Sequence, residues 1–214
     1  MNVPFRPDQF LEVFREYNEA VWPMQTVLVL GALAATTTVV MNRRWSRAAA
    51  CTILGFFWGW AGIGYHIAFF RRINPAAFGF GLLFLVQAFV LFRAGWRAQA
   101  ARRAGRGRIS KGLGGLLVFY ALVVYPWLGS VSGHPYPYSP TFGLPCPTTI
   151  FTLGLLMLAD WSVPRHVLAI PLIWATIAVY AAFELGVHED FGLLPAILAG
   201  LRLMEPQKLL SDSA

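Results

Sequence analysis

A cysteine between two prolines is the residue of this chain best placed to do chemistry. Cys146 follows Pro145 and precedes Pro147, within the stretch Gly143-Leu144-Pro145-Cys146-Pro147-Thr148-Thr149-Ile150-Phe151-Thr152-Leu153-Gly154. Proline fixes φ and lacks an amide donor, so Pro147 fits the first turn of a helix while Pro145 keeps the approach extended. We therefore expect Cys146 at a helix N-terminus, where the macrodipole favours a thiolate.

Histidines and carboxylates could complete a site around this cysteine. We take Cys146, His66 and His134 as candidate ligands for a soft or borderline metal ion, copper or zinc, because thiolate and imidazole suit these ions. The wider set of candidate ligand-binding residues adds His188, Glu184, Glu189, Asp190, Glu19, Arg71 and Arg72. No pair among them has CxxC or HxxxH spacing, so a shared site depends on helix packing. In the alternative interpretation, the prolines merely shape the start of a helix and Cys146 is a small buried side chain.

The composition indicates an integral membrane protein. Of 214 residues, 57% are hydrophobic and only 13% are charged, whereas a soluble domain carries roughly 25% charged residues. Several apolar runs approach the roughly 20 residues that cross a hydrocarbon core of about 30 Å. The first residues lack the basic start and apolar core of a cleaved signal peptide.

The apolar runs predict an all-α helical bundle with six or seven membrane spans. Residues 7–21 alternate apolar and charged faces and predict an amphipathic helix lying in the membrane interface. We expect spans at about 24–41, 48–70, 75–92, 112–131, 148–159 and 166–185. The last apolar run, 191–204, is short for a crossing and is either a seventh span or a re-entrant or interfacial helix. The chain thus divides into an interfacial helix (1–23), one membrane domain (24–204) and a tail (205–214).

The distribution of basic residues predicts the orientation. With seven spans, thirteen of the seventeen Lys and Arg residues fall on one side, seven of them within residues 93–111. The positive-inside rule makes that side cytoplasmic and puts the N-terminus outside. Cys146, His66, His134 and the acidic pair Glu189-Asp190 then share the outer face. We interpret the basic segment as facing anionic lipid and expect no nucleic-acid partner.

Several familiar chemistries have no matching pattern. The sequence has no G-x-S-x-G elbow, Walker loop, dinucleotide fingerprint or HExxH motif. No lysine falls within a predicted span, which excludes a retinal Schiff base of the rhodopsin type. We therefore assign no catalytic residue.

Some blocks of the sequence resemble an uncharacterised family. They include Tyr17-Asn18-Glu19-Ala20-Val21-Trp22-Pro23 and the Gly143–Gly154 stretch. Together they resemble bacterial polytopic membrane proteins catalogued as a domain of unknown function, over nearly the whole chain. The resemblance implies a bacterial inner (cytoplasmic) membrane and carries over no activity or site residue.

Three functional hypotheses follow. The leading one is a small transporter, channel or receptor-like protein with an outward-facing site for a small solute or soft metal ion. The second is a membrane-embedded enzyme that uses Cys146 with a histidine. The third is a structural subunit of a larger membrane complex. The lipid bilayer is the expected partner in each case, and a homo-oligomer remains open.

Overall fold

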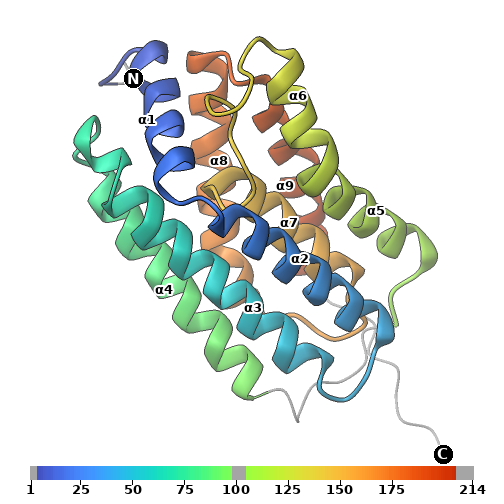
Figure 1. The fold of residues 1–214 in the computed structure, drawn as a ribbon. Coiled ribbons are helices and arrows are strands. Elements are labelled where there is room, and N and C mark those ends of the chain that lie inside the picture. The colour runs from blue at the N-terminus through green and yellow to red at the C-terminus, as the bar shows by residue number, and fades with distance from the viewer. Residues whose placement is uncertain (1–3, 98–104, 206–214) are drawn as a thin grey trace, which may run out of the picture.

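The computed structural model describes residues 4–97 and 105–205, whose regular elements are helices (Figure 1). The first half contains α1 (Pro7–Ala20), α2 (Met24–Met41), α3 (Ser46–Trp60), the π-helical η1 (Ala61–Ile67), the 3-10 turn η2 (Phe70–Arg72) and α4 (Ala77–Trp96). The second half contains α5 (Arg108–Phe119), the π-helical η4 (Tyr120–Val124), α6 (Tyr125–Val131), α7 (Pro145–Leu158), α8 (Arg165–Leu185), the 3-10 turn η5 (His188–Gly192) and α9 (Leu193–Met204). The all-α prediction is confirmed.

Within residues 4–97 and 105–205, five helical segments are long and apolar enough to cross a membrane. They are Met24–Met41, Ser46–Arg72, Ala77–Trp96, Arg108–Val131 and Arg165–Leu185. The predicted fifth and seventh spans correspond to α7, with 14 residues, and α9, with 12 residues. These two are short against the roughly 20 residues of a full crossing. Residues 206–214 of the predicted tail (205–214), and residues 98–104 of the predicted basic segment, lie outside the described residues.

Two helix starts differ from those predicted. The helix α4 begins at Ala77 rather than Pro75, because the Asn74 side chain accepts a hydrogen bond from the Ala76 amide at 3.1 Å and forms a turn first. The helix α7 begins at Pro145, with Leu144 as its extended N-cap. Both Pro145 and Pro147 therefore lie in the first turn, where an amide donor has no partner within the helix.

The short helix α7 lies in the middle of the bundle. It contacts α2, α3, α5, α8 and α9, and Figure 1 shows α2 passing in front of it. Nearly all its side chains are buried, including Thr148, Thr149 and Thr152. Thr149 and Thr152 donate to carbonyls one turn back in the same helix at 2.8 and 2.7 Å. The hydroxyls of Thr149 and Thr152 are thus paired within the apolar core, whereas the Thr148 hydroxyl has no hydrogen-bond partner among the described residues.

Close contact between two glycines brings α5 against α7. A Cβ atom added to Gly114 would lie 2.5 Å from the Leu158 amide nitrogen and 2.7 Å from the Gly154 carbonyl oxygen. A Cβ atom on Gly154 would likewise meet Leu117 at 2.7 Å. Small residues allow such backbone approach between membrane helices, where packing rather than hydrophobic burial drives association.

Arg106 caps the C-terminal end of α7. Its guanidinium donates to the carbonyls of Leu156 and Ala159, and to that of Trp161 at 3.0 Å. These bonds satisfy carbonyls that have no partner within the helix and place a cation at the negative end of its dipole. Burial lowers the pKa of Arg106 to about 10, so the side chain stays charged at neutral pH.

The helix α1 packs on the bundle through its apolar face. Phe14 and Tyr17 are buried there, and their rings lie 6.0 and 5.7 Å from the ring of Tyr65 in η1. The predicted amphipathic helix is thus present, and protein covers its apolar side. Its place in the membrane interface remains a prediction.

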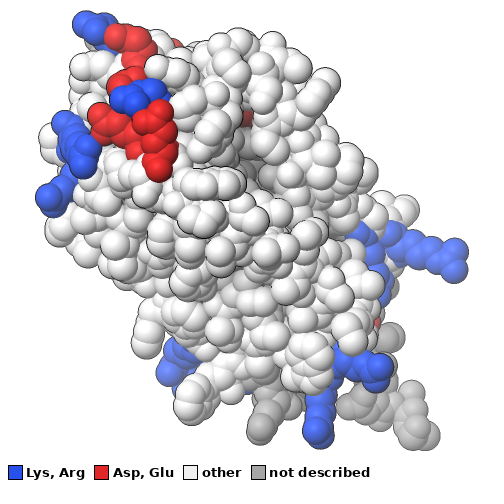
Figure 2. Space-filling model, viewed as in Figure 1, with Lys and Arg blue, Asp and Glu red and all other residues white. Residues whose placement is uncertain are grey.

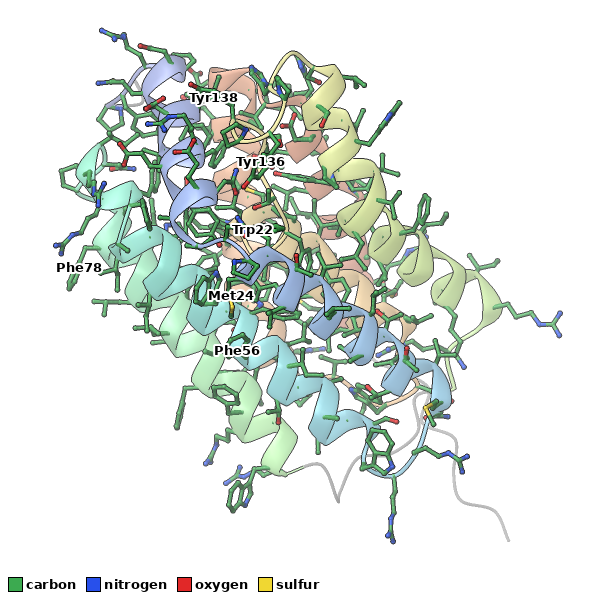
Figure 3. All side chains as sticks on the ribbon, in the orientation of Figure 1. Trp22, Met24, Phe56, Phe78, Tyr136 and Tyr138 are labelled. Carbon is green, nitrogen blue, oxygen red and sulfur yellow. The ribbon has the colours of Figure 1, made fainter. Side chains whose placement is uncertain are left out.

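Asn18 of α1 holds the proline-rich loop that precedes α7. Its side-chain amide donates to the carbonyls of Pro137 at 2.6 Å and Ser139 at 2.9 Å, and its oxygen accepts from Thr141 at 2.7 Å. Figure 3 shows Tyr136 and Tyr138 of this loop beside α1. A buried amide with all these partners fixes a loop that has little regular structure of its own.

Charged side chains gather at opposite ends of the molecule, with an uncharged band between them (Figure 2). Acidic residues accompany the basic ones at the α1 end, where Arg6 pairs with Asp8 and Arg72 with Glu16, each at 2.7 Å. Arg15 also pairs with Glu12 at 2.6 Å. Three of the four basic residues predicted to lie outside are therefore neutralised by carboxylates of α1.

Candidate functional site

A cavity of about 300 Å³ lies at the N-terminal end of α7. Its walls come from α1 and the residues before it, η1, η2, α4, the first residue of α6, the loop before α7, the first turn of α7, α8 and η5. Most of the surface is apolar and much of it is aromatic. A mostly apolar cavity with a few polar groups is typical of a small-molecule site.

Polar side chains of this cavity lie within or directly after two π-helical segments. Tyr65 and His66 belong to η1, and Tyr125 directly follows η4. Each π segment interrupts a candidate span, since Ser46–Arg72 contains η1 and Arg108–Val131 contains η4. Such interruptions frequently occur at functional sites, because the extra residue per turn changes the direction of the side chains that follow.

His66 is fully buried among aromatic rings. The centroid of its imidazole lies 4.7 Å from that of Phe84 and 5.0 Å from that of Trp174. Neither of its ring nitrogens has a hydrogen-bond partner among the described residues. An unpaired buried polar group costs about 1–3 kcal/mol, so a ligand that paired with it would gain binding energy.

Trp174 of α8 presents a second polar group to the same cavity. Its indole N–H lies near the Cys146 thiol, but makes no hydrogen bond of ordinary geometry within the described chain. Indole N–H is a donor only, so a partner must offer an acceptor. His66 and Trp174 therefore form a pair of unsatisfied groups at neighbouring positions on the cavity wall.

Asp190 and Cys146 lie together at the cavity, and their polar groups are already engaged. The Tyr125 hydroxyl donates to the Asp190 carboxylate, and the Cys146 thiol lies against the same carboxyl group. Burial raises the pKa of Asp190 to about 7. The carboxyl therefore keeps its proton to a higher pH than an exposed aspartic acid does.

Glu189 lies beside this group but outside the cavity lining. It is 1% exposed, and neither of its carboxylate oxygens has a hydrogen-bond partner among the described residues. Burial raises its pKa, and His134 lies near enough to oppose that shift. Gly129 leaves the space that it occupies, since a Cβ there would lie 3.2 Å from Oε1 of Glu189.

The structure brings together three of the ten predicted ligand-binding residues. Cys146, His66 and Asp190 line one cavity. The others, Glu19, Arg71, Arg72, His134, Glu184, His188 and Glu189, do not line it. Glu19 pairs with Arg15 at 2.6 Å, and the acidic partner of Arg72 is Glu16. Glu184 and His188 are exposed at the end of α8 and in η5.

The predicted metal ligand set is not assembled. Among the described residues, no group of three or more His, Cys, Asp or Glu side chains could hold a metal ion. His66 is enclosed by aromatic rings, whereas His134 lies in the loop near Glu189. We therefore correct the assignment of Cys146, His66 and His134 as ligands for copper or zinc.

Sequence reasoning missed the aromatic part of the site. Trp174, Tyr125, Tyr65 and Phe80 line the cavity, yet each falls inside an apolar run where an aromatic residue is unremarkable. The proline beside Tyr125 was the one local signal, because Pro126 interrupts the hydrogen bonding of its span.

These features define a helical protein with five candidate membrane spans and an apolar cavity beside the start of its central helix. The chain belongs to a family of unknown function, DUF6064, whose model matches residues 7–213. The resemblance noted from the sequence is thereby confirmed. The chain matches no curated protein and no solved structure.

Proposed function

We propose that this protein is an integral membrane protein that binds a small, mostly apolar molecule in an outward-facing cavity, as a carrier or a receptor-like protein. The proposal rests on the cavity of about 300 Å³, whose lining includes His66. This histidine is fully buried, and neither of its ring nitrogens has a hydrogen-bond partner among the described residues. Its volume is at the lower end of the range of ligand sites, roughly 300–1,000 Å³.

The orientation remains that inferred from charge. The excess of basic residues on one side supports a cytoplasmic location for the loop at 93–111 in a bacterial inner membrane. Carboxylates of α1 offset the basic residues at the opposite end. The cavity would then face the outer leaflet. Six crossings would include either α7 or α9 beside the five candidate spans, and seven would include both.

The packing of α7 supports a carrier or receptor more than a channel. A channel needs a continuous polar path, whereas α7 occupies the middle of the bundle with nearly all its side chains buried. The enzyme alternative required a histidine base at Cys146. The polar neighbours of this thiol are instead Asp190 and Trp174, and neither acts as the base of a cysteine–histidine pair.

Filling the cavity tests the proposal. Ala178 of α8 lines the cavity and is 4% exposed, whereas Ala169 on the same helix is exposed and does not line it. We expect solvent extracts of purified wild type and Ala169→Phe to contain the same bound small molecule, detected by mass spectrometry. Ala178→Phe should lose it while eluting as a folded protein in gel filtration.

A second cavity variant, Ala181→Phe, guards against misfolding of the first, because Ala181 also lines the cavity and is only half-buried. Retention of the molecule by both cavity variants would contradict the proposal. So would extracts of the wild type that contain no molecule beyond bulk lipid and detergent.

A further inference from the structure

The cavity carries information about the charge of its ligand. Among the described residues, Asp190 is the acidic one in the lining, and no lysine or arginine contributes to it. A buried phosphate or carboxylate would therefore have no cation to pair with, which is costly in an apolar site. The lining argues against an anionic headgroup.

The unpaired hydrogen-bonding groups of the cavity indicate that the ligand carries a hydrogen-bond acceptor. Asp190 already accepts from Tyr125 and lies against the Cys146 thiol. The unmet groups are the indole N–H of Trp174, a donor only, and the imidazole of His66, which has one donor when neutral. A carbonyl oxygen has two lone pairs and could accept from both donors.

The wall formed by α8 indicates the route to the site. Ile177 and Tyr180 line the cavity and are also 40% and 43% exposed on the outer surface of α8. Only one layer of side chains therefore separates the cavity from the surface of a candidate span, where hydrocarbon is expected in place of water. A molecule dissolved in the membrane could reach the cavity there.

We infer that the ligand is a neutral, membrane-soluble molecule with a ring or short hydrocarbon body and a carbonyl-type acceptor that pairs with Trp174 and His66. This inference rests on the proposed function and deepens it by naming the ligand class. The aromatic walls hold the apolar body, and the two donors select the carbonyl.

A matched series of naphthalenes tests the chemical class. The probes are 2-acetylnaphthalene, 2-ethylnaphthalene, 2-(aminomethyl)naphthalene and 2-naphthoate, which share a ring body and differ in the polar group. Binding to the full-length protein in lipid nanodiscs is measured by titration calorimetry, with empty nanodiscs subtracted. We expect the ketone to bind about 10-fold more tightly than the hydrocarbon, as one or two net hydrogen bonds provide.

Matched variants locate the polar contact. In Trp174→Phe, 2-acetylnaphthalene should bind about as tightly as 2-ethylnaphthalene, a ratio of about 1, while the affinity for 2-ethylnaphthalene changes little. Trp127→Phe is the control, because Trp127 is 60% exposed on α6 and does not line the cavity. If Trp174→Phe does not fold, His66→Phe carries the same expectation.

The outcomes separate the inference from the proposed function. Tighter binding of the amine or the naphthoate, or a ketone preference that survives in Trp174→Phe and His66→Phe, would overturn the inference while leaving a ligand site. Failure of all four probes to bind above empty nanodiscs would count against the cavity as a ligand site, and so against both.

Discussion

Alanine should destabilise the protein at Gly114 of α5, but not at the adjacent Gly115. A Cβ atom at Gly114 would lie 2.5 Å from the Leu158 amide nitrogen, about 0.9 Å inside ordinary contact, and 2.7 Å from the Gly154 carbonyl oxygen. At Gly115 no atom lies within 4 Å of an added Cβ. Gly114→Ala must therefore separate two backbones, whereas Gly115→Ala only adds a methyl group to an open surface.

The expected magnitudes follow from these distances. Overpacking costs about 1–3 kcal/mol, and the obstructing atoms here are backbone atoms that cannot rotate away. Replacing glycine by alanine inside a helix by itself stabilises the folded state by about 0.5–1 kcal/mol. We expect Gly114→Ala to lose about 2 kcal/mol net, which lowers Tm by roughly 4–8 °C in a chain of this size. Gly115→Ala should leave Tm unchanged or raise it by about 2 °C.

The two free thiols allow a simple measurement. Cys51 is 2% exposed and Cys146 is half-buried, so a maleimide dye reacts fully only when heating unfolds the bundle. Melting curves of the wild type and both variants in one detergent give the comparison. Equal shifts for Gly114→Ala and Gly115→Ala would refute the close contact between α5 and α7, since both share the same helical backbone.

Two further predictions concern the loop and the acidic pair. Gly143 and Gly133 both have positive φ, 102° and 91°, but a Cβ at Gly143 would lie 2.3 Å from a buried leucine and one at Gly133 would meet nothing within 4 Å. Alanine at either position should cost about 1 kcal/mol of backbone strain. Gly143→Ala should cost about 1–3 kcal/mol more; equal losses in thermal melts would contradict the packing of this loop. Asp190 has a folded pKa of about 7 against an ordinary 3.8, so the folded chain retains a proton that the unfolded chain releases. Stability should therefore fall as pH rises from about 4 to 7, and Asp190→Asn should flatten Tm plotted against pH; an unchanged slope would show that Asp190 is not the group responsible.

The helical architecture could be predicted from local properties of the sequence. A backbone in hydrocarbon must satisfy its own hydrogen bonds, so long apolar runs must be helices. The predicted span at 24–41 coincides with α2, and the others agree to within a few residues at most ends. The prolines around Cys146 likewise place it in the first turn of α7, because the restrictions of proline are local.

The acidic and histidine residues could not be assigned in the same way. Charge alternation predicts that His134, His188 and Glu189 lie near one membrane face, but it does not specify which side chains neighbour them. Glu189 is enclosed because Gly129 leaves room for it, and His66 because α4 and α8 bring Phe84 and Trp174 against it. For the same reason, the sequence could not show that Cys146, His66 and His134 lie too far apart to form a metal-binding group.

The sequence by itself determined that the chain forms apolar helices, where most of them begin and end, and that a cysteine opens one of them. Each of these depends on interactions within a few residues or on transfer of a segment from water to hydrocarbon. Only the tertiary structure decided that α7 is enclosed and that His66, Trp174, Asp190 and Cys146 share a cavity. Those neighbours come from different helices, and which helices touch depends on shape complementarity between whole surfaces, such as Gly114 against Gly154, that no single segment contains.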